Sequence, residues 1–412
     1  MAIAALKPHH KKKKRISSRT SMKISTLVFA SLLVVFSVGV FAKDQSVEAV
    51  NDSSFDSSSR IVAIGDIHGD FNRFVDVLRA TNIIDNKNDW SGKKATLVQL
   101  GDSTDRGPDS RKAIDLMRKL KKQAIKAGGK VIVVIGNHEL MNVTGDLRFV
   151  HPGEYAAFAD KRSQKRMDSY YKRFVAMLKA QTPRNEKFEL AGNHREKWNK
   201  EHPLGFVAHR KAWNHLGEYG KWTRLNPAAA IVGNTVFVHG GISTKYANMS
   251  LRELNKRVRA EIADPRTWGP DSIIDDPEGP FWYRGWAEQL ETNENEAALD
   301  EILNNLGVER MVVGHTPLVN TVLPRFGGKV ILVDAGMADY YFSSNAALEL
   351  NGDSAYAIVA GQRLKLPTTT EGKVDYLTKA SELVSDNTRI RAYIRTLIAA
   401  PEIEMKLKQA SQ

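Results

Sequence analysis

Six short apolar runs in this chain end in an aspartate or in another residue that can bind a metal ion. Five of them end at Asp66, Asp102, Asn137, His239 and His315. Each run has four to six residues rich in β-branched side chains, and a glycine-containing turn generally follows, which is typical of β-strands. Because strand ends gathered along one edge of a sheet form a single crevice, we expect these side chains to meet there.

The composition is that of a soluble globular protein. The 412 residues are 42% apolar and 26% charged, enough for one large domain or two ordinary ones. The net charge of +13 is concentrated near the start, since residues 1–42 hold eight Lys and Arg and no Asp or Glu. The other residues have 52 basic against 47 acidic side chains, so nucleic acid is not an expected partner.

Cysteine is absent from the sequence. Its absence excludes disulfides, thiolate metal sites and a cysteinyl-phosphate intermediate. Any metal site must therefore use oxygen and imidazole ligands.

The segment 24–42 is uncharged over 19 residues and follows a basic cluster. As a helix it would span about 28 Å, close to the ~30 Å apolar core of a bilayer. Two outcomes remain open: a type II single-pass anchor, or a signal peptide cleaved near Ala42 that gives a secreted or lumenal protein. Both place the chain in the secretory pathway, whereas Lys11–Arg15 alone would suit a nuclear localisation signal.

Residues 43–60 form a serine-rich linker, and the chain contains three Asn-x-Ser/Thr sequons. Asn51, on the linker, is the strongest glycosylation candidate, and Asn248 is another. Asn142 lies only five residues past Asn137, too near the expected crevice to carry a glycan.

The main domain is expected over residues 61–365. Helical spacing of apolar residues between the first three strands predicts helices near 71–78 and 110–126, and hence right-handed crossovers and a largely parallel core. Charged, aromatic-dotted segments at about 143–230 predict an inserted helical cap. The strand-like runs after Met311 are expected to form a second sheet, and residues 366–412 a C-terminal helical tail.

The strand-end residues form a plausible pair of metal sites. Asp66 and His68 can converge on one cation, and the two oxygens of Asp102 can bridge two cations. Asn137, His239 and His315 can complete the second site. This mixture of nitrogen and oxygen ligands suits Mn, Fe or Zn better than Ca or Mg. Taken singly, each residue is more often a helix cap, a turn residue or a structural histidine, so the prediction depends on their occurring in order.

The neighbouring motif residues suit a phosphate substrate. Arg106 offers a planar fork to phosphoryl oxygens, and Glu139 is a candidate anchor for it. His138 is free to act as a general acid, with Asp105 as the partner that holds its tautomer. Two metals about 3.5–4 Å apart can lower the pKa of a bridging water to about 7, so the resulting hydroxide can attack phosphorus directly.

These motifs resemble the phosphoprotein phosphatase family of calcineurin-like metallophosphoesterases. The resemblance rests on Gly65-Asp-x-His-Gly69, Gly101-Asp-x-x-Asp-Arg-Gly107, Gly136-Asn-His-Glu139, His239-Gly-Gly241 and Gly314-His315. Finer details are similar to the Shewanella-like branch: Ser103-Thr104, Leu140–Asp146 and Phe281–Trp286. The resemblance implies an α/β fold, a four-layer αββα sandwich with an inserted helical cap.

The resemblance also implies roles for single residues. The first metal would be held by Asp66, His68 and Asp102, and the second by Asp102, Asn137, His239 and His315. His138 would be the acid paired with Asp105. Arg106, Arg284 and Asn137 would bind phosphate, with Arg284 assigned only from its position between His239 and His315. The implied cofactors are two divalent ions, Mn first, with Fe or Zn as alternatives.

The expected function is that of a phosphomonoesterase acting on phosphoprotein, on either tyrosine or serine and threonine. A hydrolase of diadenosine tetraphosphate or other nucleotides shares the same core and is the alternative within the enzyme class. From another class, the chain could be a catalytically silent, membrane-tethered phosphate-binding scaffold. The presence of His138, Asp105 and Arg106 favours an enzyme.

Overall fold

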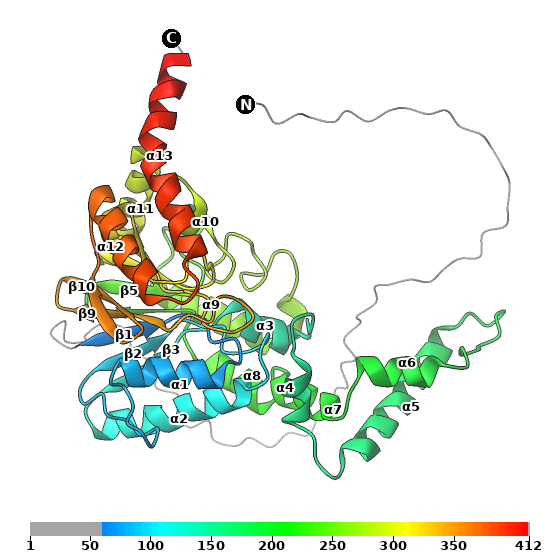
Figure 1. Ribbon diagram of the computed structural model, residues 1–412. Coiled ribbons are helices and arrows are strands. Elements are labelled where there is room, and N and C mark those ends of the chain that lie inside the picture. The colour runs from blue at the N-terminus through cyan, green and yellow to red at the C-terminus, as the bar shows by residue number, and fades with distance from the viewer. Residues whose placement is uncertain (1–59, 411–412) are drawn as a thin grey trace. The chain divides into compact units, whose positions relative to one another are not determined.

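The computed structural model describes residues 60–410, with side chains through residue 399. The apolar segment 24–42 and the sequon at Asn51 lie outside the described residues. Two β-sheets with helices on their outer faces form the core of this part of the chain (Figure 1). The expectation of an αββα sandwich with a helical insertion is confirmed.

The first sheet has the order β11-β10-β9-β1-β2-β3. Its strands are β1 (Ile61–Ile64), β2 (Thr96–Gln99), β3 (Lys130–Val133), β9 (Ala346–Asn351), β10 (Ser354–Val359) and β11 (Gln362–Lys365). Strands β1, β2 and β3 are parallel, with Ile61 opposite Thr96 and Thr96 opposite Lys130. Because parallel neighbours point the same way, the loops after these three strands lie along one edge.

The second sheet has the order β4-β5-β6-β8-β7. Its strands are β4 (Ala229–Val232), β5 (Thr235–Val238), β6 (Arg310–Val313), β7 (Leu323–Arg325) and β8 (Val330–Leu332). Strand β6 is parallel to both β5 and β8. The loops after these three strands therefore also share one edge.

The assignment of the last strands to the second sheet was wrong in part. Strands β7 and β8 belong to it, but β9 pairs antiparallel with β1 in the first sheet, with Ile61 opposite Leu350, and β10 and β11 follow. Residues 346–350 are buried throughout. A fully buried strand has no polar face in its sequence, so its pattern cannot show which sheet it will join.

Helices α1 (Phe71–Ala80) and α2 (Ser110–Lys126) lie against the outer side of the first sheet (Figure 1). In α1, Asp70 accepts a hydrogen bond from Arg73 N (3.1 Å), which caps the start of the helix. Phe74, Val77 and Leu78 then recur at helical spacing and are buried.

Helices α9 (Leu251–Ala263) and α11 (Asn293–Leu306) bury their apolar stripes with the second sheet. The Asn255 side chain accepts from Ala228 N (2.7 Å) and donates to Ala229 O (2.9 Å). It thereby satisfies backbone groups at the edge strand β4. Residues 60–410 also contain three 3-10 turns: η1 (Thr244–Tyr246), η2 (Pro265–Thr267) and η3 (Phe326–Gly328).

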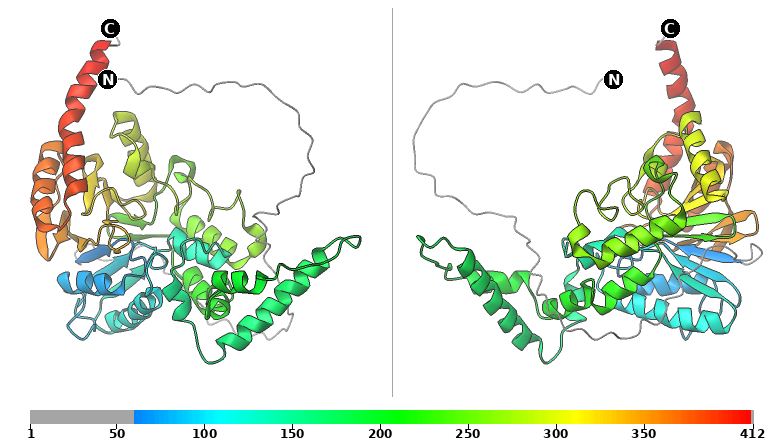
Figure 2. Two further views of the ribbon diagram at one scale, coloured as in Figure 1. Left: turned by 45° about the vertical axis from the view of Figure 1, so that its right-hand side comes forward. Right: turned by 180° about the vertical axis from the view of Figure 1, so that it is seen from behind.

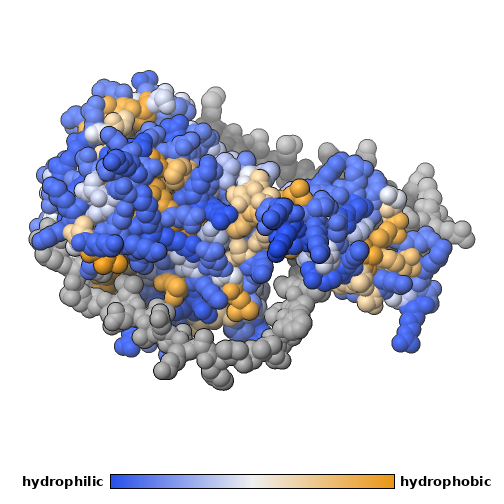
Figure 3. Space-filling model, turned by 90° about the horizontal axis from the view of Figure 1, so that it is seen from below, coloured by the Kyte–Doolittle hydropathy of each residue, from blue (hydrophilic) through white to orange (hydrophobic). Residues whose placement is uncertain are grey.

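The helical insertion follows α3 (Asn137–Thr144) and ends before β4. It contains α4 (Pro152–Ala156), α5 (Ser163–Gln181), α6 (His194–Glu201), α7 (Phe206–Trp213) and α8 (Glu218–Leu225). Helices α5 and α6 extend away from the sheets in both views of Figure 2. They have a small core of their own around Met167, Trp198 and Phe206. From below, the surface is mostly hydrophilic, with apolar patches both on the insertion at the right and on the rest of the molecule (Figure 3).

A buried carboxylate fastens the insertion to the sandwich. Glu154, in α4, is 2% exposed and accepts a hydrogen bond from the backbone N–H of Ser110 (2.8 Å), the first residue of α2. A negative side chain is favoured at a helix N-terminus, where backbone N–H groups lack partners. Burial raises the pKa of Glu154 to about 7.

The C-terminal part contains α10 (Gly285–Glu288), before α11, and the pair α12 (Thr370–Leu383) and α13 (Thr388–Ala410). Lys373 of α12 and Arg325 of β7 both form ion pairs with Glu291, which join α12 to the second sheet. None of the helices within residues 60–410 is long and apolar enough to cross a membrane.

Replacing Glu154 by Gln should change how stability depends on pH. A carboxyl with a pKa of about 7 when folded and 4.5 when unfolded binds more protons in the folded state between those values. The wild-type free energy of unfolding should therefore fall on the order of 3 kcal/mol as the pH rises from 4.5 to 7. The Gln variant keeps an acceptor for Ser110 without this loss. Denaturant unfolding at pH 5 and pH 8 measures the difference, and an equal slope in both proteins would contradict it.

Candidate active site

The predicted strand-end residues come together, but from two sheets. Asp66 and Asp102 follow β1 and β2, and Asn137 follows β3, whereas His239 and His315 follow β5 and β6. The His315 backbone N–H donates to Asp66 Oδ1 (3.1 Å), and His239 Nδ1 donates to Leu100 O (2.6 Å). The crevice therefore lies where the loop edges of both sheets face each other, and the expectation of a single sheet edge was wrong.

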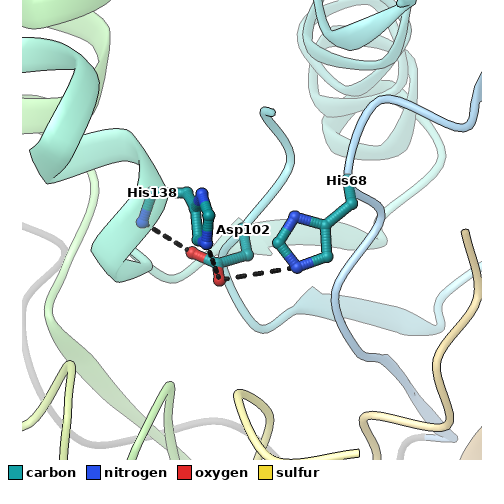
Figure 4. A group of neighbouring side chains, drawn as sticks. All are labelled: His68, Asp102 and His138. Carbon is teal, nitrogen blue, oxygen red and sulfur yellow. Dashed lines mark hydrogen bonds and ion pairs between the residues drawn. The ribbon is translucent and has the colours of Figure 1, made fainter. Parts of the chain in front are cut away.

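Asp66, His68 and Asp102 form the first group. His68 Nε2 lies 3.8 Å from Asp66 Oδ2 and 3.8 Å from Asp102 Oδ2. The other ring nitrogen of His68 faces Thr104 O at 3.1 Å, so it carries the proton and Nε2 is free for a cation. Figure 4 shows Asp102 between His68 and His138.

Asp102, Asn137, His239 and His315 form the second group. His239 Nε2 lies 3.3 Å from Asp102 Oδ2 and 2.9 Å from Asn137 Oδ1. Ligand atoms of Asp102, His239 and His315 lie within 4.8 Å of one another, and the same holds for His68, Asp102 and His138. Asp102 is common to both sets, which is the arrangement that a carboxylate bridging two cations requires.

The donor set fits divalent cations. His315 Nε2 is buried and has no hydrogen-bond partner among the described residues, although buried polar atoms are generally paired. Burial, with the charges of Asp334 and Asp102, raises the pKa of Asp66 well above its usual value. Burial also lowers the pKa of His68 to about 3, so its imidazole is neutral. Buried carboxylates and the neutral imidazole of His68 are donors that a bound cation would stabilise.

Glu139 supports this site from behind, in α3. Its carboxylate accepts hydrogen bonds from the backbone N–H groups of Asp102 (2.9 Å), Ser103 (2.7 Å) and Gly136 (2.8 Å). The expectation that Glu139 anchors Arg106 was wrong, because both of its oxygens are occupied by these donors. At Gly136 a Cβ atom would collide with the Asp102 carboxylate, so the close approach of these loops requires glycine.

His138 and Asp105 form a buried pair beside the two groups. His138 Nδ1 lies 2.7 Å from Asp105 Oδ2, and the His138 backbone N–H donates to Asp102 Oδ1 (2.9 Å). Burial lowers the pKa of His138, but Asp102 and Asp105 outweigh it and raise that pKa above its usual value. The Nε2 atom lies 3.9 Å from Asp102 Oδ2, so a protonated His138 presents its free N–H toward the metal ligands.

Two arginines border the site. The guanidinium of Arg106 lies between the rings of Phe149 (3.8 Å) and Tyr340 (4.5 Å), and its Nε has no hydrogen-bond partner among the described residues. Arg284 Nη1 donates to His315 O (2.9 Å) and Thr316 Oγ1 (3.0 Å). Arg284 therefore lies next to the candidate ligand His315. Its position in the sequence was the sole basis for predicting that it binds phosphate.

Sequence reasoning missed Asp334, although a signal was present. Asp334 follows the apolar strand β8, just as the other ligands follow theirs. It is buried near Asp66, and burial raises its pKa to about 6. No pattern in the sequence indicates that Phe149 and Tyr340 lie against Arg106, because these contacts come from distant loops.

Two of the predicted glycosylation sequons differ in their exposure to solvent. Asn142 is fully buried and cannot carry a glycan, in line with its expected position near the crevice. Asn248 is exposed, two residues before Ser250, which caps α9.

Comparison with known proteins identifies the family. The calcineurin-like phosphoesterase family matches residues 59–142 and 140–318, which include every candidate ligand. The chain belongs to this family. It is therefore a phosphoric monoester hydrolase of a family that uses divalent metals, and its buried His and Asp groups fit a metal site.

Individual relatives narrow the assignment to the Shewanella-like protein phosphatase branch. An uncharacterised Schizosaccharomyces pombe protein is 32% identical over 73% of this chain and 79% of its own length. Shewanella-like protein phosphatase 2 of Arabidopsis thaliana is 29% identical, covering 82% of this chain and 87% of its own. The crystal structure of a cold-active protein-tyrosine phosphatase from a psychrophilic Shewanella species has a TM-score of 0.56 and 26% identity, covering 75% of this chain and 80% of that one.

Replacing Glu139 by Gln should weaken metal binding. One of the three backbone N–H groups would then face the amide N–H₂ group, and the loop that carries Asp102 would lose its fixed position. Changes in groups that orient metal ligands typically lower metal affinity about 10- to 100-fold. Titration of the metal-depleted variant with Mn²⁺ measures the change. Glu288→Gln, at an exposed glutamate, is the matched control, and equal affinities in the two variants would contradict the assigned role.

Proposed function

We propose that this protein is a dinuclear-metal-dependent protein phosphatase that prefers phosphotyrosine. The observation that carries the proposal is the position of Asp102, which is shared by both ligand groups and lies beside the His138–Asp105 pair. A bridging carboxylate next to a proton donor is what direct hydrolysis of a phosphate ester requires.

The six strand-end side chains would hold the two metal ions. Asp66, His68 and Asp102 suit the first ion, and Asp102, Asn137, His239 and His315 suit the second. When bound, the ions supply the positive charge that activates a water molecule and polarises the phosphate. We propose Mn²⁺, because the donors combine imidazole with carboxylate and amide oxygen, although Fe and Zn accept a similar set.

The remaining residues would bind the phosphate and move a proton. Arg106 and Arg284 carry guanidinium groups suited to phosphoryl oxygens, and Asn137, of the second ligand group, would contact the phosphate from there. His138 would donate the proton on Nε2 to the leaving oxygen, while Asp105 holds Nδ1–H and keeps the ring in place. No covalent phosphoenzyme is needed in this scheme.

The aromatic side chains around Arg106 support a preference for an aryl ester. Tyr340 is 60% exposed and contacts the Arg106 guanidinium, as do Phe149 and Tyr341. Tyr341 also lies beside His68, and Phe149 beside His138. The flat faces of these rings can pack against the phenyl ring of a phosphotyrosine whose phosphate reaches the metal site. The relative from Shewanella is itself named a protein-tyrosine phosphatase.

A substrate panel with added Mn²⁺ tests this function. Phosphotyrosine peptides should be hydrolysed faster than phosphoserine peptides, phosphothreonine peptides or diadenosine tetraphosphate. His138→Ala should lower kcat about 10²- to 10⁴-fold, as expected for loss of a general acid, with His215→Ala, in the insertion, as the control. Faster turnover of the nucleotide would favour the small-molecule alternative, and a metal-loaded protein without turnover would favour the scaffold.

We further propose that residues 24–42 take the chain into the secretory pathway, as a type II anchor or as a signal peptide cleaved near Ala42. The support is the uncharged 19-residue segment behind a basic cluster. Intact mass and carbonate extraction of membranes should show either the complete chain in the membrane or a soluble chain that begins at Lys43. A chain whose Asn248 stays unglycosylated and that fractionates with the cytosol or nucleus would contradict the proposal.

A further inference from the structure

The carboxylate of Asp105 is buried, and each of its oxygens has a different partner. Oδ2 faces His138 Nδ1 at 2.7 Å, and Oδ1 accepts a hydrogen bond from Asn142 Nδ2 at 2.8 Å. Asn142 lies one turn after His138 in α3 and is itself fully buried. The same nitrogen lies 3.0 Å from Thr104 Oγ1 and 3.1 Å from His138 O, so its two hydrogens are shared among three acceptors around this pair.

Without the Asn142 amide, Asp105 would be poorly held. Its Oδ1 has one other hydrogen-bond partner among the described residues, Thr104 Oγ1, at 3.3 Å. Asp105 has a φ of 70°, a conformation that L-residues seldom adopt unless their surroundings enforce it. A buried carboxylate with an unsatisfied oxygen is costly and would rotate toward any remaining donor. Such rotation would move the oxygen that orients the His138 ring.

A second residue reaches Asn142 from the helical insertion. Arg210, in α7, donates from Nη1 to the backbone oxygen of Asn142 (2.5 Å). That oxygen is among the last four carbonyls of α3, which have no partner within the helix. α3 ends at Thr144, and a Cβ atom at the next residue, Gly145, would lie 3.4 Å from Arg210 Nη2. The guanidinium therefore sits directly on the C-terminal end of α3.

The positive charge of Arg210 is not paired with a carboxylate of the described residues, and burial lowers the pKa of this side chain. A positive charge is favoured at the C-terminus of a helix, where the carbonyl oxygens point. The insertion thus places a costly cation where it stabilises the last turn of α3, which carries Asn142.

We propose that Asn142 is a positioning residue for the Asp105–His138 pair and that Arg210, from the insertion, holds Asn142 in place. The inference rests on the proposed function, because it assumes that His138 delivers a proton to the leaving oxygen. It assigns the insertion a part in catalysis: without it, the metal ligands are complete but the proton donor is loosely held.

A leaving-group comparison tests the role of Asn142. Phenyl phosphate has a leaving oxygen that needs a proton, whereas the leaving group of 2,4-dinitrophenyl phosphate departs without one. In the Mn²⁺-loaded full chain, Asn142→Ala should lower kcat for phenyl phosphate about 10- to 100-fold. This loss is smaller than the ~10²- to 10⁴-fold effect of general acid catalysis, because the acid is misplaced and not removed. The substitution should change kcat for the dinitrophenyl ester by less than about 3-fold and leave KM and metal content unaltered.

Arg210 provides an independent test through a matched series. Arg210→Met removes the donor and should cause the same selective loss on phenyl phosphate, though a smaller one. Arg210→Lys keeps one donor for the Asn142 carbonyl and should restore most of the rate. Arg173→Met, at an exposed arginine of α5, is the control and should match the wild type on both esters.

The results separate this inference from the proposed function. A wild type that hydrolyses neither ester with Mn²⁺ bound refutes the proposed function. An active wild type whose Asn142→Ala and Arg210→Met variants lose both esters equally, or lose neither, refutes the positioning role. If Asn142→Ala does not fold, the Arg210 series decides the matter, because rescue by lysine is expected only if donation to Asn142 matters.

Discussion

The position of Asp102 depends on hydrogen bonds that leave it almost no freedom. Its backbone oxygen accepts from the N–H groups of Ile67 and His68 (3.0 and 2.9 Å), and its own N–H donates to Glu139. Its Oδ1 accepts from His138 N, which leaves Oδ2 toward the histidines. The loops after β1 and β2 and the start of α3 are thus tied together at one carboxylate. The positions of both ligand groups and of His138 therefore depend on Asp102.

Much of the fold and of the centre could be predicted because each depends on local sequence. The strands that carry Asp66, Asp102 and His239 are short β-branched runs with turn residues behind them, and parallel pairing aligns their ends. The place of β9 could not be predicted, since a strand buried on both faces satisfies either sheet equally well. The partners of Glu139 could not be predicted either, because a carboxylate in the first turn of a helix can reach a side chain or a backbone N–H group.

In the sequence, the helical insertion lies between the candidate ligands of the first sheet and those of the second. It has a small core of its own around Trp198. Among the polar contacts that join it to the sandwich, two are made at helix ends close to the site. Glu154 contacts the start of α2, and Arg210 contacts the end of α3. The two contacts use opposite charges at opposite helix ends, each with the sign that the helix dipole favours. An insertion with such attachments can vary at its outer end without disturbing the metal ligands.

The division of the ligands between two sheets also bears on how the protein assembles. Three ligand-bearing loops belong to one sheet and two to the other. The second ligand group, with Asp102 and Asn137 on one side and His239 and His315 on the other, is therefore complete only when both sheets meet. Ions that bind only the finished centre favour the docked arrangement of the sheets over any arrangement in which they part. The metals would then link the two sheets. A shortage of metal in the cell would lower the fraction of the protein that reaches the folded state.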